Sequence, residues 1–169
     1  MYENIIVKET EKEDLKNVLA LWNDGEVMKF VGFPEGLGET MESVEAWYTW
    51  IDSGRPKHNH YSIYEETLGY CGEAFYAIDQ EHGNTAALDI KLHLAARGKG
   101  IAKKALSYAI KEVFFNGAEK VWVDPNPENK KAIALYERLQ FVKEEMPAYL
   151  MESESDVNFI PVYMERIKE

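Results

Sequence analysis

One continuous stretch decides the fold: residues 88–102, which read LDIKLHLAARGKGIA. Its first half, Leu88–Leu94, is typical of a strand, and its second half, Arg97–Ala102, is a glycine-containing loop. The apolar residues then follow a helical period. This stripe comprises Ile101, Ala102, Ala105, Leu106, Ala109, Ile110 and Val113, and it stops at Gly117, a natural left-handed cap. The sequence therefore predicts a strand, a glycine loop and an amphipathic helix in succession.

The loop suits a phosphate group. Gly98 and Gly100 allow the backbone to approach an anion and to adopt unusual dihedral angles. The free N–H groups at the helix start, aided by the helix dipole, point at such a charge. Lys99, Lys103 and Lys104 add positive potential. By itself a Gly-x-Gly turn before a helix is a weak motif, and a plain loop is the alternative interpretation.

Two other phosphate-binding motifs fit less well. A Walker loop ends in Gly-Lys-Ser or Gly-Lys-Thr, which the chain lacks. A dinucleotide-binding Rossmann fingerprint requires a third glycine where Lys103 stands, and it normally opens the first βα unit. The Rossmann reading remains only a weak rival.

The segments before this stretch predict both strands and helices. A strand is expected at Ile5–Val7, and Thr10 with Glu13 forms a capping box for a helix that runs to Asn23. A glycine-containing loop at 32–38 precedes a second helix. The further elements are a helix at Met41–Ile51 and antiparallel strands at Tyr61–Tyr64, Leu68–Ile78 and Ala86–Leu94.

After Gly117 we expect a buried strand at Val121–Val123. Asn126 then caps a helix with Pro127 in its first position, which runs to Leu139. Segments 141–150 and 159–167 suggest a closing hairpin. The predicted fold is α/β (α+β): a single domain over residues 1–169, with a mostly antiparallel central sheet and helices on both faces.

Composition limits the possible functions. The formal net charge of -11 argues against a nucleic-acid partner, which needs a basic face. Between Arg97 and Lys143, however, ten Lys or Arg face five Asp or Glu, a local excess of five positive charges that suits an anionic ligand. No apolar run approaches the ~20 residues of a membrane span, and no signal peptide is recognisable, so we expect a cytoplasmic protein. Cys71 is the single cysteine, which excludes a disulfide framework or a cysteine metal cluster, and we expect a buried thiol and no metal.

Two motifs together resemble one family. Arg97–Ala102 resembles the Arg/Gln-x-x-Gly-x-Gly/Ala signature of the GNAT superfamily of acetyl-CoA-dependent N-acetyltransferases, and Asn129–Tyr136 resembles its Asn-x-x-Ala-x-x-x-Tyr helix. The resemblance covers roughly residues 68–141. Residues 22–51 are similar in outline to the branch that contains ribosomal-protein N-terminal acetyltransferases, and aminoglycoside acetyltransferases are another related branch. Gln140 stands where this family commonly has glycine, at a cost of ~1 kcal/mol if the position is left-handed.

The resemblance implies acetyl-CoA as co-substrate and assigns residues to it. The backbone of Leu92, His93 and Leu94 is expected beside the pantetheine arm, where main-chain donors stabilise developing negative charge. His93 is alternatively a plain strand residue. Asn129 matches a cofactor-bonding side chain and also suits helix capping. The remaining cofactor-binding residues implied are Arg97, Gly98, Lys99, Gly100, Ile101, Ala102 and Lys103.

Two catalytic residues follow from the same resemblance and from the chemistry. Tyr136 matches the tyrosine that protonates the departing thiolate; a core tyrosine is the alternative. A protonated amine cannot attack, so a base must accept its proton. Asp89 and Glu73 lie on neighbouring predicted strands, and we favour Asp89, with an ion pair to Lys91 or Lys120 explaining a charge between Leu88 and Ile90.

The acidic remainder of the chain predicts a cationic acceptor: a small primary amine such as an aminoglycoside or polyamine, or a peptide N-terminus. Candidate acceptor contacts are Glu35, Glu39, Glu42 and Glu45, for which solubilising surface charge is the alternative. A non-catalytic module that binds acetyl-CoA as a sensor is the competing function. The sequence leaves the oligomeric state open, a homodimer included.

Overall fold

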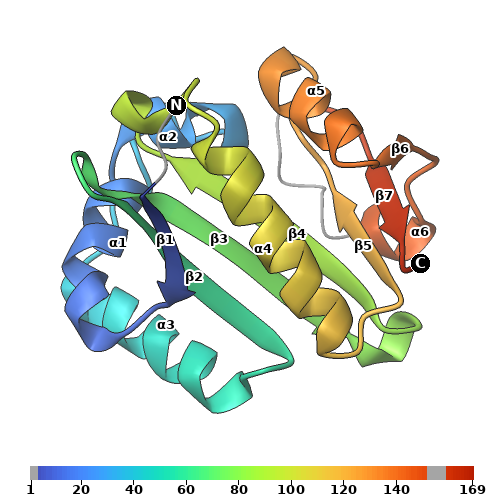
Figure 1. Ribbon diagram of the computed structural model, residues 1–169, viewed down its shortest axis with the longest axis horizontal. Helices are drawn as coiled ribbons and strands as arrows, with labels where there is room; N and C mark the ends of the chain where they lie inside the picture. The colour runs from blue at the N-terminus through green and yellow to red at the C-terminus, as the bar shows by residue number, and fades with distance from the viewer. Residues whose placement is uncertain (1–3, 152–158) are drawn as a thin grey trace.

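The structure is a computed structural model that describes residues 4–151 and 159–169, built around one seven-stranded sheet (Figure 1). The strands lie in the order β1-β2-β3-β4-β5-β7-β6. Neighbouring strands are antiparallel except β4 and β5, which are parallel. Their bounds are β1 Ile5–Glu9, β2 His58–Glu65, β3 Gly69–Asp79, β4 Thr85–Leu92, β5 Lys120–Val123, β6 Val142–Lys143 and β7 Met164–Ile167. The predicted α/β fold with a mostly antiparallel sheet is confirmed.

Helices cover both faces of the sheet, as predicted. The α-helices are α1 Leu15–Trp22, α2 Gly25–Met28, α3 Met41–Gly54, α4 Ile101–Phe115, α5 Lys130–Arg138 and α6 Ala148–Met151. Short 3-10 turns are η1 Lys12–Asp14, η2 Lys29–Val31, η3 Gln80–His82 and η4 Leu94–Ala96. In Figure 1, α4 crosses the front of β3 and β4.

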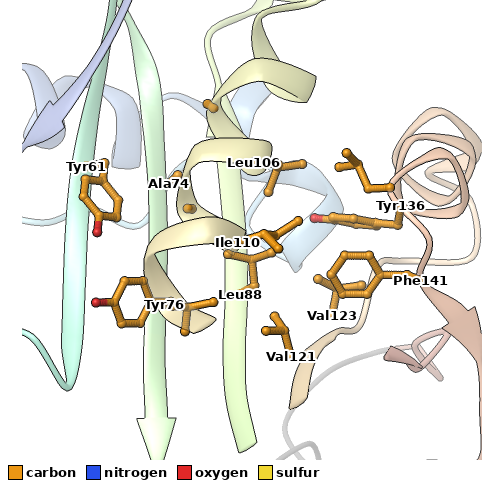
Figure 2. Packing of buried hydrophobic residues seen from close by; sticks show 14 of the residues in the cluster. Tyr61, Ala74, Tyr76, Leu88, Leu106, Ile110, Val121, Val123, Tyr136 and Phe141 are labelled. Atoms are coloured by element: carbon orange, nitrogen blue, oxygen red, sulfur yellow. The ribbon is translucent and has the colours of Figure 1, made fainter. Parts of the chain in front are cut away.

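The main core lies between α4 and the sheet. All but one of the predicted stripe residues of α4 are buried, and Ala102, the exception, packs against the same cluster. Figure 2 shows Leu106 and Ile110 of this helix facing Ala74, Tyr76 and Leu88 of the sheet. Each large aliphatic side chain buried here stabilises the fold by roughly 1.5–3 kcal/mol. Alternate residues of a strand point to opposite faces, so Leu88, Ile90 and Leu92 face α4, whereas Asp89 and Lys91 face the other side.

The opposite face is covered by α1 and α3 through an aromatic cluster. Trp22 of α1 lies edge-on to Trp47 of α3, with ring centroids 4.8 Å apart, and Trp47 lies edge-on to His60 of β2 at 4.6 Å. Helix α3 begins with a capping box between Thr40 and Ser43.

The predicted capping box at Thr10 is wrong. The Thr10 hydroxyl is buried and hydrogen-bonds His60 Nδ1 at 2.6 Å and Ser62 Oγ at 2.7 Å. Glu11 and Asp14 form the box instead, and α1 starts only at Leu15. The Thr10 hydroxyl therefore bonds to side chains of β2 and does not cap the helix.

Two further predicted boundaries change. Helix α5 begins at Lys130, not at Pro127, because Asn126 Oδ1 accepts from Glu128 N at 2.9 Å in a local turn and Asn129 is the actual N-cap. The predicted closing hairpin is present only as the short antiparallel pair β6–β7. Helix α6 lies between these two strands in the chain. Part of the region between them, residues 152–158, lies outside the described residues.

Gln140 ends α5 in the left-handed conformation, with φ of 72°. Its N–H donates to Glu137 O, and Phe141 N–H donates to Tyr136 O. These bonds satisfy carbonyls that the helix end leaves open. The predicted strain of ~1 kcal/mol at a non-glycine residue therefore applies here.

Candidate active site

The site is a cleft that opens where β4 and β5 separate. These two strands pair only over Thr85–Ala87 with Lys120–Trp122, while β4 continues to pair with β3 as far as Leu92. In an antiparallel pair, alternate main-chain groups point away from the partner strand. The segment Leu88–Leu92 therefore presents main-chain donors and acceptors to the gap. The cleft has a volume of about 890 Å³.

The glycine loop closes the cleft at the start of α4. Gly98 and Gly100 have φ values of 74° and 79°, and an added Cβ at either would meet nothing within 4 Å. Backbone conformation therefore requires glycine at both positions. Arg97 ties the loop down, because its Nε donates to Leu92 O at 3.1 Å and its Nη2 donates to Glu26 O at 3.0 Å.

This end of the cleft is positively charged. The first main-chain bond of α4 runs from Lys104 N to Gly100 O, which leaves the N–H groups of residues 101–103 outside the helical ladder. Five cationic side chains of the cleft lining belong to the loop, α4 and α5: Arg97, Lys103, Lys130, Lys131 and Arg138. Open N–H groups at a helix start beside cationic side chains are an arrangement suited to binding an anion.

Tyr136 lies where α5 borders the cleft. Its side chain is only 5% exposed, and its ring lies edge-on to Phe141 with centroids 5.5 Å apart. Figure 2 shows the hydroxyl directed away from α5 and toward α4. Burial, reinforced by the carboxylates of Asp89 and Asp124, raises the pKa of Tyr136 well above its usual value. The phenol is therefore protonated at neutral pH.

Asp89 and Lys91 lie side by side on the face of β4 away from α4, as an ion pair between Lys91 Nζ and Asp89 Oδ2. The predicted partner Lys91 is thus confirmed, whereas Lys120 pairs with Glu165 at 3.2 Å. Burial by itself lowers the pKa of Lys91, but Asp89 and Glu73 raise it above its usual value. The Asp89 carboxylate remains 44% exposed, so a ligand can reach it.

Glu73, the alternative base, is buried on the face of the sheet that α1 and α3 cover. Its Oε2 hydrogen-bonds His60 Nε2 at 2.6 Å, and its Oε1 accepts from Trp22 Nε1. Burial raises the pKa of the Glu73 carboxyl, but the charge and hydrogen bond of His60 outweigh this and lower it to about 2. A carboxylate so stabilised and enclosed is a weak proton acceptor.

The structure brings most predicted site residues to this one cleft. The predicted residues among its lining are Asp89, Leu92, Leu94, Arg97, Gly98, Gly100, Ile101, Ala102, Lys103, Asn129 and Tyr136. His93 and Lys99 do not line it. His93 Nδ1 instead contacts Asp24 Oδ2 at 3.3 Å, which favours its structural interpretation. Asn129 Oδ1 accepts from Ala132 N at 3.3 Å, so this side chain does cap α5.

Sequence reasoning missed the opposite wall of the cleft. It includes Val27, Phe30, Val31, Asp124, Pro125, Asn126, Glu128 and Phe159. Asp124 directly follows a buried strand, and a carboxylate in such a loop position could have indicated a functional site from the sequence. No sequence motif marks the apolar lining residues Val27, Phe30, Val31 and Phe159. None of the four candidate glutamates between Glu35 and Glu45 lines this cleft.

Residues 4–151 and 159–169 contain no group of three or more His, Cys, Asp or Glu side chains that could hold a metal ion. Within the same residues, no helix is long and apolar enough to cross a membrane. Cys71 is buried, as predicted.

Comparison with known proteins agrees with this geometry. The family model of the acetyltransferase (GNAT) domain matches residues 4–142. Spermidine N-acetyltransferase from Vibrio cholerae, solved with CoA and spermine, has a TM-score of 0.79 at 20% identity and is covered over 95% of its length by 97% of this chain. A phosphinothricin acetyltransferase from Sinorhizobium meliloti, solved with AcCoA, has a TM-score of 0.78 at 16% identity, with 98% of this chain and 89% of that one covered.

One curated relative shares a shorter segment. N-alpha-acetyltransferase MAK3 from Arabidopsis thaliana is 43% identical over 47 residues, which are 28% of this chain and 25% of that protein. The match thus spans about a quarter of that relative. The glycine loop, the open helix start and the cations along α4 and α5 fit the phosphates of coenzyme A. Because the family model covers most of the chain, the chain belongs to the GNAT family of acetyltransferases.

Proposed function

We propose that the protein transfers the acetyl group directly to the primary amine of a cationic acceptor. The observation that carries this proposal is the cleft through the sheet between β4 and β5. Its α4 side carries the glycine loop and five cations, whereas Asp89 borders its other side. An anionic donor and a cationic acceptor therefore approach from opposite faces.

The donor end is held by backbone and lysines. Gly98, Gly100 and the open N–H groups at the start of α4 would bind the pyrophosphate, with Lys103 close by. Main-chain groups of Leu88–Leu92 are available to the pantetheine arm and to the carbonyl of the acetyl group. When bound, acetyl-CoA supplies the acetyl group as an activated thioester.

Asp89 accepts the proton that the acceptor ammonium must lose before its nitrogen can attack. The ion pair with Lys91 orients the carboxylate, and its exposure leaves room for the acceptor. The nitrogen then bonds to the acetyl carbon while the carbon–sulfur bond breaks. The bound nitrogen also loses a second proton, which restores the phenol of Tyr136 after that residue has protonated the sulfur, so the products are the N-acetylated amine and coenzyme A.

Tyr136 donates its phenolic proton to the departing sulfur. Its raised pKa keeps that proton in place until the sulfur becomes basic. The sulfur departs in the same low-dielectric cleft, where burial raises the pKa of a thiol as well, so proton transfer between the two groups stays feasible.

The test is thiol release from acetyl-CoA with a panel of primary amines that includes aminoglycosides, polyamines and peptides. Acceptor-dependent release, together with mass spectrometry of the N-acetylated amine, is the expected result. Calorimetric binding of acetyl-CoA without turnover on any amine would contradict the proposal and favour a non-catalytic sensor.

A further inference from the structure

A row of polar side chains crosses the sheet on the face away from α4 and ends at Asp89. Lys91 of β4 pairs with Asp89 and lies opposite Glu73 of β3, and directly opposite residues bring their Cβ atoms to about 4.5–5.5 Å on one face. His60 of β2 hydrogen-bonds Glu73 at 2.6 Å, and Thr10 bonds His60 at 2.6 Å. The row therefore connects the cleft to the interior of the protein.

Exposure rises along this row toward the cleft. The side chains of His60 and Glu73 are only 1% and 4% exposed. The side chain of Lys91 is 16% exposed, and that of Asp89 is 44% exposed. Lys91 and Asp89 line the cleft, whereas His60 and Glu73 do not. Glu73 is therefore a group behind the cleft, which can act on a ligand only through its neighbours.

Both oxygens of the Glu73 carboxylate are held by hydrogen bonds. Oε2 accepts from His60 Nε2 and Oε1 accepts from Trp22 Nε1. An ionised carboxylate only accepts, so the proton of the first bond belongs to His60 Nε2. Behind His60, Thr10 Oγ bonds both the Nδ1 atom and Ser62 Oγ, the latter at 2.7 Å. These contacts fix the position of a negative charge inside the sheet layer.

Lys91 transmits this fixed position to the cleft. Burial lowers the pKa of Lys91, but the charges of Asp89 and Glu73 outweigh it and raise the pKa, and Asp124 acts in the same direction. A lysine side chain is long and flexible, so an ion pair with one exposed carboxylate leaves its ammonium several positions. Attraction from a second carboxylate that cannot move restricts the ammonium to one of them. Lys91 in turn restricts the Asp89 carboxylate.

Stability alone is a weak reason for such a row, because buried ion pairs can often be replaced by apolar side chains of similar size without loss of stability. The row ends, however, at the proposed base. We infer that Glu73 is a positioning residue for acetyl transfer: it holds Lys91, which aims the Asp89 carboxylate at the acceptor nitrogen. This inference rests on the proposed function and adds a residue outside the cleft to those on which turnover depends.

The test is a double-mutant cycle between Glu73 and Asp89, measured by thiol release with spermidine, kanamycin and a peptide beginning Ser-Gly as acceptors. Glu73→Gln should lower kcat/KM for the accepted amine about tenfold, through a misplaced base, and leave the KM for acetyl-CoA unchanged. In the Asp89→Asn background the same change should have an effect of less than about twofold, because the group that Glu73 positions is already lost. Equal effects in both backgrounds would mean a purely structural role and overturn the inference.

Glu65→Gln is the matched control for the loss of a buried carboxylate. Glu65 Oε2 accepts from Thr67 N and Leu68 N at 2.8 Å in the turn after β2, and this residue does not line the cleft. Its variant should lower the thermal midpoint and leave kcat/KM for the amine unchanged. The same fall in kcat/KM in Glu65→Gln as in Glu73→Gln would attribute the effect to general loosening of the sheet and contradict the inference.

Lys91→Met keeps the test valid if Glu73→Gln does not fold. Methionine retains a long unbranched side chain and removes the ammonium, so kcat/KM should again fall about tenfold. Wild-type kcat/KM in Lys91→Met, or in a folded Glu73→Gln, overturns the inference alone if Asp89→Asn is impaired. Full activity of Asp89→Asn removes the proposed base and the inference with it, and no release with any amine contradicts the proposed function itself.

Discussion

The two sides of the cleft are built in different ways. The donor side comes from one continuous stretch, from β4 through the glycine loop into α4. The proposed acceptor side combines η2, the loop after β5 and Phe159, which lie far apart in the chain, and Asn126 Nδ2 joins two of these segments by its hydrogen bond to Phe30 O. One continuous stretch fixes the backbone of the donor side as a unit, whereas a wall assembled from separate segments can change one side chain at a time. This difference predicts that mutations on the two sides separate cleanly in kinetics.

The largest effect is expected where the two sides meet. Tyr136→Phe removes the proton donor and keeps the buried ring, so kcat should fall by about 10²–10⁴-fold, the usual contribution of a general acid. The KM for acetyl-CoA and the thermal midpoint should stay close to those of the wild type. Steady-state thiol release and a thermal melt measure both, and an unchanged kcat would exclude the acid role.

Asp89→Asn tests the acceptor side. We expect kcat/KM for the amine to fall about 10²-fold near neutral pH, within the range of a lost general base. Raising the pH should restore activity, because a larger fraction of the free amine is then deprotonated in solution. A pH–rate profile measures this, with Glu42→Gln as control for the loss of one exposed carboxylate outside the cleft. Full activity at neutral pH would assign the proton to another acceptor.

Gly100→Ala tests the donor side. A Cβ at φ of 79° meets no neighbour but strains the backbone by roughly 1 kcal/mol, so the loop should shift away from its anion-binding shape. The KM for acetyl-CoA should rise about tenfold, while the KM for the amine stays constant. Gly117→Ala is the matched control, since Gly117 follows the far end of α4 with φ of 111°. An equal rise in the KM for acetyl-CoA in both variants would mean that helix stability, not the cradle, is responsible.

The smallest effect concerns stability alone. Gln140→Gly relieves the left-handed strain at the end of α5 and should raise the free energy of unfolding by up to about 1 kcal/mol. Denaturant melts measure this change, and both KM values should be those of the wild type. A loss of stability would show that the Gln140 side chain contributes more than its backbone costs.

Prediction from sequence succeeded where the deciding interactions are local. The stripe of α4, the left-handed ends at Gly117 and Gln140, and the Asp89–Lys91 pair follow from residues close together in the chain. It failed at Thr10, because the partners that decide its role, His60 and Ser62, lie about fifty residues away on β2. The helix start at Asn126 failed for a similar reason, since this side chain serves a turn and a contact to η2.

The sequence by itself determined the donor: glycine at 98 and 100, an amphipathic helix directly after them, and the Asn129–Tyr136 motif are enough to indicate coenzyme A. Only the tertiary structure decided where the proposed acceptor side lies and what lines it. The separation of β4 from β5 after Ala87 depends on pairing between distant segments, and the apolar wall depends on which loops pack beside that gap. Backbone conformation is encoded locally, whereas the contents of a cleft are set by contacts that no single stretch of sequence contains.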